Sequence, residues 1–254
     1  MINKGSQDKI LAIIRQKSGI TPKEIIANHN TTRAMVFRHL KILAKNNQIF
    51  KIGTTPKVKY YPKLNMDNNT KIEQTFFGWA MTGETQLTTA DWICPTRDVF
   101  QARQEKLLII LKNIVSENLL YLMVGMVGEI GNNSFDHNLG NWRDTAGVLY
   151  CADIDAREII LADRGQGILS TIRRVRPETP NDESALNTAF TEIISGRAPE
   201  QRGNGLKFVK KIIEENNLSL QFFSGNAKVE IINGKFTVTK NDKIIPGSLA
   251  IIKF

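Results

Sequence analysis

Three short boxes of polar residues and glycines, in a fixed order in the second half of the chain, constrain the fold more than any other feature. In the first box Glu129, Asn133 and His137 recur every four residues, so a helix would place them on roughly one face. In the second box an apolar run ends at Asp163 and continues as Arg-Gly-Gln-Gly. In the third box Gly-Asn-Gly at 203–205 opens another helical pattern. This order supplies a metal ligand, a carboxylate that can recognise a base and a phosphate-binding turn, which together indicate a magnesium-nucleotide site.

The pattern around the boxes predicts the elements that carry them. Residues 119–138 have apolar positions at helical spacing, which predicts a helix with the first box on its polar face. Residues 147–153 and 158–162 are apolar runs of strand length, and the second run leads into the second box. Beyond the third box, residues 218–254 contain four strand-like pieces.

These boxes resemble the N, G1 and G2 boxes of the Bergerat-fold, or GHKL, ATPases, the group of gyrase, heat-shock chaperones, histidine kinases and mismatch-repair proteins. The resemblance covers residues 100–254. It implies a Bergerat-type α/β sandwich with a mixed sheet, and ATP and Mg²⁺ as cofactors. By position, Asn133 would hold the Mg²⁺ ion, Glu129 would be the catalytic residue that positions or activates a water molecule, and Asp163 would accept a hydrogen bond from the adenine amino group.

The same resemblance implies further cofactor-binding residues. Two glycines of the second box would let the backbone approach the adenine ring closely, and free backbone amides at the start of a helix favour phosphate. The expected cofactor-binding residues are Asn133, His137, Asp163, Gly165, Gly167, Gly203, Gly205, Leu206 and Ser248, with Ser248 in place of a threonine near the adenine. Residues 168–202 correspond to the nucleotide lid of the family, where Arg197 and Arg202 either reach the phosphates or are simply solvated.

Positive charge is concentrated in the first quarter of the chain. Residues 1–63 contain thirteen Lys and Arg against two acids, a balance of +11, whereas the remaining residues contain 21 bases against 23 acids. A solvated surface would spread this charge evenly. A confined basic block beside a nearly neutral body predicts a module that binds a polyanion.

The pattern of this basic block predicts three short helices followed by a hairpin. Thr21-Pro22 with Glu24 is a capping box that starts the second helix. Thr31 or Thr32 caps a third helix that runs to about residue 46. The expected inner stripe of the third helix is Val36, Leu40 and Leu43, joined by Met35 or Phe37. Two apolar runs at 49–52 and 58–61 then flank a basic turn.

Over residues 5–63 this order of elements resembles a winged helix-turn-helix domain. In that geometry the start of the third helix enters the major groove and the wing contacts phosphates or the minor groove. We therefore expect binding to double-stranded DNA, and a protein-binding winged helix with a solvated basic face is the alternative. The expected DNA-binding residues are Thr32, Arg33, Arg38, Lys41, Lys51, Lys57 and Lys59.

The sequence thus predicts an α+β protein in three parts. The parts are a winged helix-turn-helix domain at 1–63, a linker or docking segment at 64–96, and a GHKL-type ATP-binding domain at 97–254. In the middle segment Phe76, Phe77 and Trp79 either fill a local core or cover an oligomer interface. A homodimer is therefore compatible with the sequence, as it is for many winged-helix proteins.

The leading functional hypothesis is an ATP-binding, DNA-binding regulator in which Mg-ATP controls the winged helix or a partner protein. The alternative is a protein Ser/Thr kinase similar to the anti-sigma-factor kinases, or a slow ATPase, acting on a separate partner. An ATPase or kinase activity is favoured, and whether the chain is an enzyme stays open. Residues 64–128 contain no histidine, which argues against autophosphorylation of the histidine-kinase type. A scaffold with a degenerate site is disfavoured by the intact boxes.

Composition narrows the location of the protein. The chain contains no run of about 20 apolar residues that would span a membrane, and its N-terminus lacks the apolar core of a signal peptide. Cys94 and Cys151 are the only cysteines, and we expect reduced, buried thiols. The sequence therefore favours a cytoplasmic protein with no membrane association.

Overall fold

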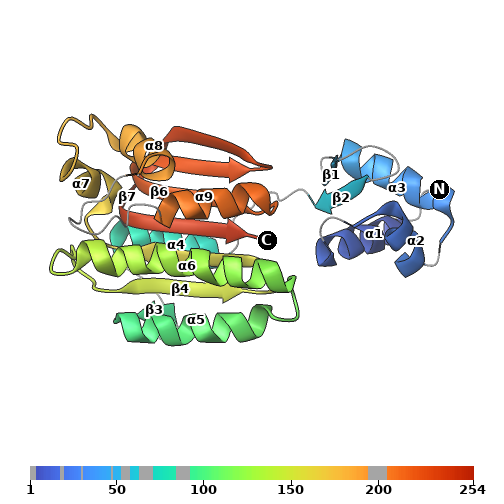
Figure 1. Cartoon of the computed structure of the whole chain (residues 1–254), viewed down its shortest axis with the longest axis horizontal. Coiled ribbons are helices and arrows are strands. Elements are labelled where there is room, and N and C mark those ends of the chain that lie inside the picture. The colour runs from blue at the N-terminus through green and yellow to red at the C-terminus, as the bar shows by residue number, and fades with distance from the viewer. Residues whose placement is uncertain are drawn as a thin grey trace. The chain divides into compact units, whose positions relative to one another are not determined.

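The chain forms two compact units, which cover Met1–Asn68 and Asn69–Phe254 and are considered separately (Figure 1). The computed structural model describes residues 4–17, 20–29, 31–46, 48–52, 58–62, 71–83, 92–193 and 205–254. Helices and strands are both abundant, so the fold is α+β, as expected. The division between the units falls inside the segment 64–96, which the sequence assigned to a linker or docking region.

Three helices and a two-stranded antiparallel hairpin make up the N-terminal unit. The elements are α1 (Lys4–Gln16), α2 (Pro22–His29), α3 (Arg33–Lys45), β1 (Ile49–Ile52) and β2 (Lys59–Pro62). The capping box at the start of α2 forms, because the Glu24 amide donates to Thr21 Oγ1 at 3.3 Å and the Thr21 amide donates to Glu24 Oε2 at 2.8 Å. An isolated bridge also joins Ile20 to Tyr60.

The third helix begins and ends close to its predicted bounds, but its buried face differs from the prediction. Thr32 is the N-cap, and its hydroxyl accepts from the Met35 amide at 3.3 Å. The buried residues of α3 are Val36, His39, Leu40 and Leu43. The prediction that Met35 or Phe37 completes this face is wrong, because both are about 40 % exposed and His39 takes the inner position instead.

The larger unit is built on one five-stranded sheet. Its helices are α4 (Lys71–Thr82), α5 (Arg97–Leu111), α6 (Glu117–Asn138), α7 (Gly167–Arg173), α8 (Asp182–Thr191) and α9 (Gly205–Glu215). Its strands are β3 (Ile93–Cys94), β4 (Val148–Asp153), β5 (Glu158–Asp163), β6 (Ser219–Ile232) and β7 (Lys235–Lys253), in the order β3-β4-β5-β7-β6.

The prediction of a mixed sheet is wrong. All neighbouring strands among the described residues pair antiparallel. Two tight hairpins are one reason, since β4–β5 and β6–β7 each reverse within a few residues, at Arg157 and at Asn233-Gly234, which have positive φ. The segment that carries α7, α8 and α9 then places β6 beyond β7, so β6 does not pair with β5.

The tail also differs from its prediction. The four strand-like pieces in 218–254 join into the two long strands β6 and β7. Register shifts around Gly225 absorb the polar stretch that the sequence pattern treated as a break.

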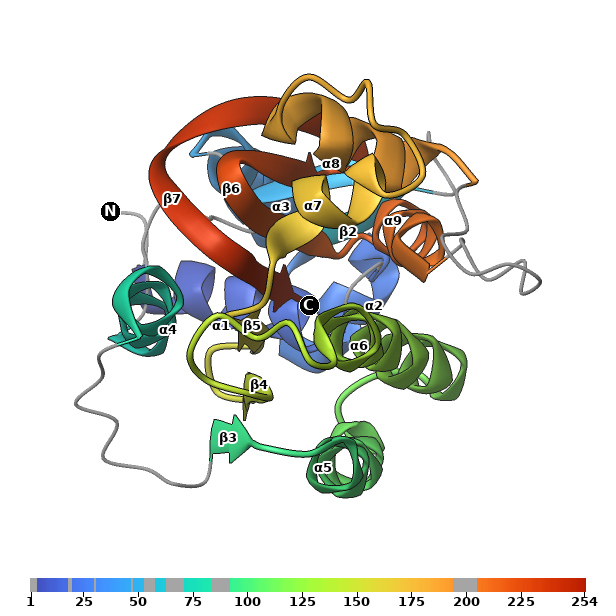
Figure 2. The same cartoon turned by 90° about the vertical axis from the view of Figure 1, so that its left-hand side faces the viewer.

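Alternate residues of the strands face two different layers of helices. On one face Ile159 and Leu161 pack with α5, α6, α8 and α9, and on the other Ile160 and Ala162 pack with α4. Figure 2 shows α4 on one side of the sheet and α5, α6 and α9 on the other. The aromatic residues of the middle segment belong to the second layer, where Phe76, Phe77 and Trp79 are buried against the sheet.

Polar contacts fix both ends of α4 to the sheet. Near its start the buried Glu73 pairs with Lys253 of β7 at 2.8 Å. At its end the buried Arg164 donates Nη1 hydrogen bonds to the carbonyls of Trp79 and Ala80, at 3.1 and 2.8 Å. Such carbonyls in the last turn lack partners within the helix, so Arg164 caps α4. Arg164 also pairs with Asp144, and the guanidinium lowers the pKa of that carboxyl.

The two cysteines are free thiols in the larger unit. Cys94 is buried and Cys151 is half-buried, so the expected burial holds fully for the first and partly for the second. Burial raises the pKa of both thiols, for Cys151 to about 11. None of the helices in the described parts of the chain is long and apolar enough to cross a membrane.

Candidate functional site

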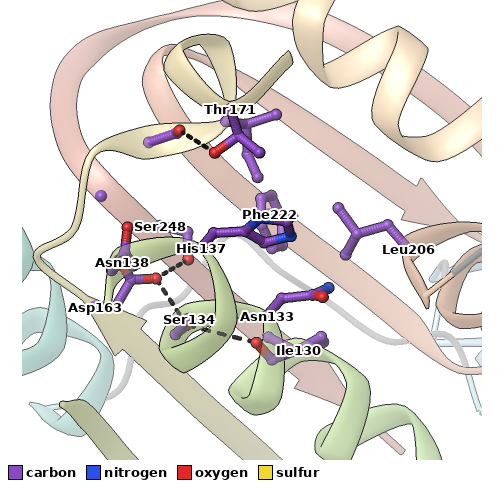
Figure 3. Close-up of a pocket in the computed structure, with 13 residues that line it drawn as sticks. Ile130, Asn133, Ser134, His137, Asn138, Asp163, Thr171, Leu206, Phe222 and Ser248 are labelled. Carbon is purple, nitrogen blue, oxygen red and sulfur yellow. Dashed lines mark hydrogen bonds between the residues drawn. The ribbon is translucent and has the colours of Figure 1, made fainter. Parts of the chain in front are cut away.

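A pocket of about 370 Å³, part of it open to solvent, lies beside the C-terminal half of α6. It is lined by Ile130, Asn133, Ser134, His137, Asn138, Asp163, Gly167, Ile168, Thr171, Leu206, Phe222, Gly247 and Ser248. Figure 3 shows Asp163, Asn138 and Ser248 gathered at one end of this space and Leu206 at the other. The pocket therefore joins residues of all three sequence boxes.

One face of α6 forms a wall of the pocket. Asn133 and His137 lie on this face, as the spacing of the first box predicted. Ile130, Ser134 and Asn138 form a second row at the same four-residue spacing and also line the pocket. Two adjacent rows of the helix, rather than one, therefore face the site.

Asp163 is the polar centre of the pocket. It ends β5 and is 3 % exposed. Its Oδ1 accepts hydrogen bonds from Asn138 Nδ2 at 3.2 Å and from the Gly165 amide at 2.8 Å. Its Oδ2 accepts from Ser134 Oγ at 2.9 Å and from Ser248 Oγ. Four donors match the capacity of a carboxylate for about four hydrogen bonds.

The electrostatics of Asp163 are a balance between burial and hydrogen bonding. Burial raises the pKa of its carboxyl, and the hydrogen bonds from Ser248, Gly165, Ser134 and Asn138 oppose that rise. The donors on Oδ2 are both hydroxyls, which rotate about their C–O bonds. A serine that turns its hydroxyl hydrogen away frees a lone pair of Oδ2, which a ligand N–H group could then use.

Glycines are required where the backbone crowds this carboxylate. A Cβ at Gly165 would overlap the Asn138 side chain, and a Cβ at Gly247 would overlap the Asp163 carbonyl. Gly167 has φ +78°, and a Cβ there would lie 2.8 Å from the Pro246 carbonyl oxygen. Gly165 and Gly167 are predicted site residues, and so is Ser248, whereas its neighbour Gly247 is not among the residues predicted from the sequence.

The third box is described only in part. Gly205 begins α9, and Leu206 lines the pocket. Gly203, Arg197 and Arg202 lie outside the described residues. The predicted catalytic residue Glu129 is exposed and does not line the pocket, but its Oε2 would lie 2.6 Å from a Cβ placed on Gly205. Glu129 therefore faces the start of α9 beside Asn133, at the edge of the site.

Sequence reasoning missed several lining residues. Ser134 and Asn138 had a usable signal, because they continue the row of Ile130 at helical spacing next to the predicted row. Phe222 and Thr171 had none, since their position depends on how β6 and α7 pack against the sheet. Both are close to the site only because distant segments of the chain meet there.

The composition of the pocket fits an adenine nucleotide. Ile130, Ile168, Leu206 and Phe222 give apolar surface for a flat ring, and the Asp163 carboxylate offers an acceptor for a ring amino group. The Asn133 amide offers an oxygen ligand, which a hard cation such as Mg²⁺ prefers. Apolar walls with a few well-placed polar groups are typical of small-molecule and cofactor sites.

The N-terminal unit carries the predicted DNA-binding residues on its surface. Thr32 at the N-cap of α3 and Arg33, Arg38 and Lys41 on the helix are exposed, and the Arg33 guanidinium lies 5.6 Å from the centre of the Phe37 ring. On the hairpin Lys51 and Lys59 are exposed, and Lys57 lies outside the described residues.

The register of the hairpin separates its two described lysines. Lys51 pairs directly with Tyr60, whereas Lys59 pairs with Ile52. Successive side chains of a strand alternate between faces, so Lys51 and Lys59 lie on opposite faces of the hairpin. The structure therefore does not bring all the predicted wing contacts together.

Comparison with known proteins adds no relative to this picture. No family model matches the sequence, and no curated protein matches it.

Proposed function

We propose that this chain is a DNA-binding regulator whose larger unit binds Mg-ATP, and that nucleotide binding changes the affinity of the N-terminal unit for double-stranded DNA or for a partner protein. The observation that carries the proposal is the buried Asp163 carboxylate at one end of an apolar-walled pocket. An ionised carboxylate only accepts hydrogen bonds, so it favours a base with an amino group at that position. The resemblance of the three boxes to those of GHKL ATPases supports the same ligand.

Different residues of the pocket would contact different parts of the nucleotide. Asp163 would accept the adenine amino group, and Phe222 and Ile168 would pack against the ring. Asn133 would be a ligand of Mg²⁺, which when bound neutralises part of the phosphate charge. The first backbone amides of an α-helix such as α9 have no partner within the helix, and such amides favour phosphate groups.

In this proposal the N-terminal unit is the part of the chain that binds DNA. Its three helices and hairpin resemble a winged helix-turn-helix domain, and the balance of +11 over residues 1–63 suits a polyanion. Arg33 and Lys41 lie two turns apart on one exposed row of α3, where they would contact phosphates or bases. ATP can change DNA affinity only if it binds two states of the protein with different affinities. As part of this proposal we place the protein in the cytoplasm, a compartment that contains ATP.

Calorimetric titration of Mg-ATP into the full chain tests the nucleotide site. Wild type should bind, and Asp163→Ala should lose binding, because the variant removes the only carboxylate that lines the described pocket. Asp155→Ala is the matched control, since Asp155 is an exposed acid in the turn between β4 and β5. Wild type that fails to bind Mg-ATP would contradict the proposal.

Fluorescence anisotropy with a labelled mixed-sequence DNA duplex tests whether the chain binds DNA and whether Mg-ATP changes that affinity. Arg33→Ala and Arg38→Ala should each weaken binding and lower the slope of log affinity against log salt by about one if the residue contacts a phosphate. The affinity should also differ with and without Mg-ATP. Equal affinities in the two conditions would remove the coupling while leaving ATP binding intact.

A second candidate function is a protein Ser/Thr kinase or slow ATPase that acts on a partner protein. The observation that favours it is the exposed Glu129 carboxylate, which faces the start of α9 beside Asn133. A carboxylate there suits a general base for a water molecule or a hydroxyl group. Release of labelled phosphate, or its transfer to proteins encoded beside this chain, should fall at least tenfold in Glu129→Gln with ATP binding retained. No release or transfer by wild type would leave the regulator as the function.

A further inference from the structure

Asn138, the last residue of α6, uses both ends of its side-chain amide to connect α6 with the loop after β5. It is buried, with 4 % of its surface exposed. Its Nδ2 donates to Asp163 Oδ1 at 3.2 Å, and its Oδ1 accepts from the Gln166 amide at 3.0 Å. One side chain therefore holds both the carboxylate and the turn that follows it.

Gln166 of this loop also contacts the end of α6. Its Nε2 donates to the His137 carbonyl, one of the last carbonyls of α6, which have no partner within the helix. Its Oε1 accepts from Arg174 Nη2 at 2.6 Å. Gly165 lies between the connected residues, and a Cβ there would overlap Asn138. The end of α6 and this loop are thus built as one closed unit around Asn138.

The two oxygens of Asp163 are held differently. Oδ1 is held by Asn138 and by the Gly165 amide, which are donors of fixed direction. Oδ2 is held by the hydroxyls of Ser134 and Ser248, which can turn away. Oδ2 is therefore the oxygen with lone pairs that can be released to a ligand N–H, while the donors on Oδ1 keep the carboxylate in place.

We infer that Asn138 is a positioning residue that sets the base selectivity of the pocket by fixing the Asp163 carboxylate. The inference rests on the proposed nucleotide site. An ionised, fixed carboxylate accepts from an amino group and disfavours an oxo group, which has no hydrogen to donate. Loss of the Asn138 donor leaves a buried charge less satisfied, so the carboxyl takes up a proton more readily. A protonated carboxyl donates, and it then tolerates an oxo group.

Paired titrations of Mg-ATP and Mg-ITP into the full chain test this role. The two ligands share sugar and phosphates and differ only on one edge of the base, where adenosine has a 6-amino group beside an unprotonated N1 and inosine has a 6-oxo group beside an N1–H. Effects on the phosphate side therefore cancel in the ratio. Wild type should prefer ATP by about 10- to 100-fold, the factor that one hydrogen bond to a charged group provides. In Asn138→Ala the preference should fall below about threefold, mainly through weaker ATP binding.

Matched variants separate positioning from a general structural effect. Asn141→Ala, in the exposed turn after α6, should keep the wild-type ratio. If Asn138 had only a structural role, Asn138→Ala would weaken the binding of ATP and ITP equally. The ratio of the two affinities would then be unchanged, and this result would overturn the inference. Failure of wild type to bind either nucleotide would instead contradict the proposed function as a whole, and the inference with it.

Asn138→Asp gives a second test that does not depend on how well the alanine variant folds. The new carboxyl keeps an acceptor for the Gln166 amide but replaces the donor to Asp163 with a like charge. Affinity for ATP should be at least tenfold weaker than wild type at pH 8 and should recover as the pH falls to 6, because a proton shared by the two carboxyls replaces the lost donor.

The pH profile of wild-type ATP affinity is the control for contributions from other groups near the pocket. These groups are His137 on α6 and the pair of Arg164 with Asp144, all of which both proteins retain. A profile of Asn138→Asp that runs parallel to the wild-type profile would overturn the inference.

Discussion

The two units gather their candidate binding residues in different ways. In the N-terminal unit the described candidates are exposed side chains of α3, its N-cap and the hairpin strands, all between Thr32 and Lys59. In the larger unit the pocket draws on α6, β5, α7, α9, β6 and β7, between Ile130 and Ser248. A surface site of the first kind needs one helix to form, whereas an enclosed site of the second kind needs most of its unit to be folded.

This comparison predicts that the two sites respond separately to substitution. Damage to the larger sheet should remove nucleotide binding and leave the basic surface intact, and damage to α3 should do the reverse. All three tryptophans of the chain lie in the larger unit, at positions 79, 92 and 142. Tryptophan fluorescence therefore reports on the larger unit alone, and hydrogen exchange of α3 peptides reports on the N-terminal unit.

The largest effect is expected for Lys253→Met. Lys253 is 7 % exposed and lies 2.8 Å from Glu73 and 3.9 Å from Glu158, both buried. Removal of this cation should lower the free energy of unfolding of the larger unit by about 3–5 kcal/mol, the usual cost of breaking a buried ion pair. Urea unfolding followed by tryptophan fluorescence measures it. Lys235→Met, at an exposed position of the same strand, should change it by less than about 0.5 kcal/mol.

A smaller loss is expected for Gly247→Ala. The added Cβ overlaps the backbone carbonyl of Asp163, which cannot turn aside as a side chain can. The larger unit should lose about 1–3 kcal/mol, and ATP affinity should fall with it. In the control Gly78→Ala a Cβ meets nothing within 4 Å on an exposed position of α4, and stability should rise by about 0.5–1 kcal/mol. Equal melting temperatures of the two variants would contradict the crowding at Gly247.

Thr32→Ala acts on the other unit. It removes the side-chain oxygen that caps α3 and should destabilise the N-terminal unit by about 1 kcal/mol. Faster hydrogen exchange of peptides from α3, with an unchanged tryptophan transition, is the expected result. Thr32→Ser keeps the cap and should restore the exchange rate, and a similar loss in both variants would show that the methyl group matters instead.

The smallest effect concerns pH. His39 is 2 % exposed, its Nδ1 has no hydrogen-bond partner among the described residues, and burial, followed by His29 and Arg38, lowers its pKa below 6.5. The unfolded chain therefore binds a proton more readily, so stability is present above pH 6.5 and falls as the pH drops below it. The loss between pH 7 and pH 6 is at most about 0.7 kcal/mol. Hydrogen exchange of α3 should show it in wild type and not in His39→Gln.

Local pattern predicted the N-terminal unit better than the larger one. The bounds of α2 and α3 follow from Thr21 and Thr32, whose capping depends only on residues three positions away. The buried face of α3 shows the limit of prediction from local pattern, because His39 is buried there instead of the expected Phe37. Apolar character favoured Phe37, but its position on the helix placed it on the exposed surface, where it contacts Arg33.

In the larger unit the boxes predicted which segments meet, but not the strand order. Asp163, Leu206 and Ser248 share the pocket as expected. Asp163 ends β5 and Leu206 lies in the first turn of α9, whereas Ser248 lies within β7 and pairs with Asp163. The antiparallel sheet was not predicted, because strand direction depends on which strand lies beside which, and β6 pairs across to β7 rather than with β5. The roles of Ser134 and Asn138 likewise required Asp163 to be placed first.

The attachment of α4 to β7 has a consequence for synthesis of the chain. α4 is the first element of the larger unit and β7 is its final strand, yet Glu73 and Lys253 pair directly. During synthesis on the ribosome, α4 has no β7 to pack against until the rest of the unit has been made, which takes roughly 10–40 s at typical elongation rates. During that time its Phe76, Phe77 and Trp79 face water or a chaperone. The N-terminal unit needs no such partner and can fold first, so a nascent chain should acquire its basic surface well before its pocket.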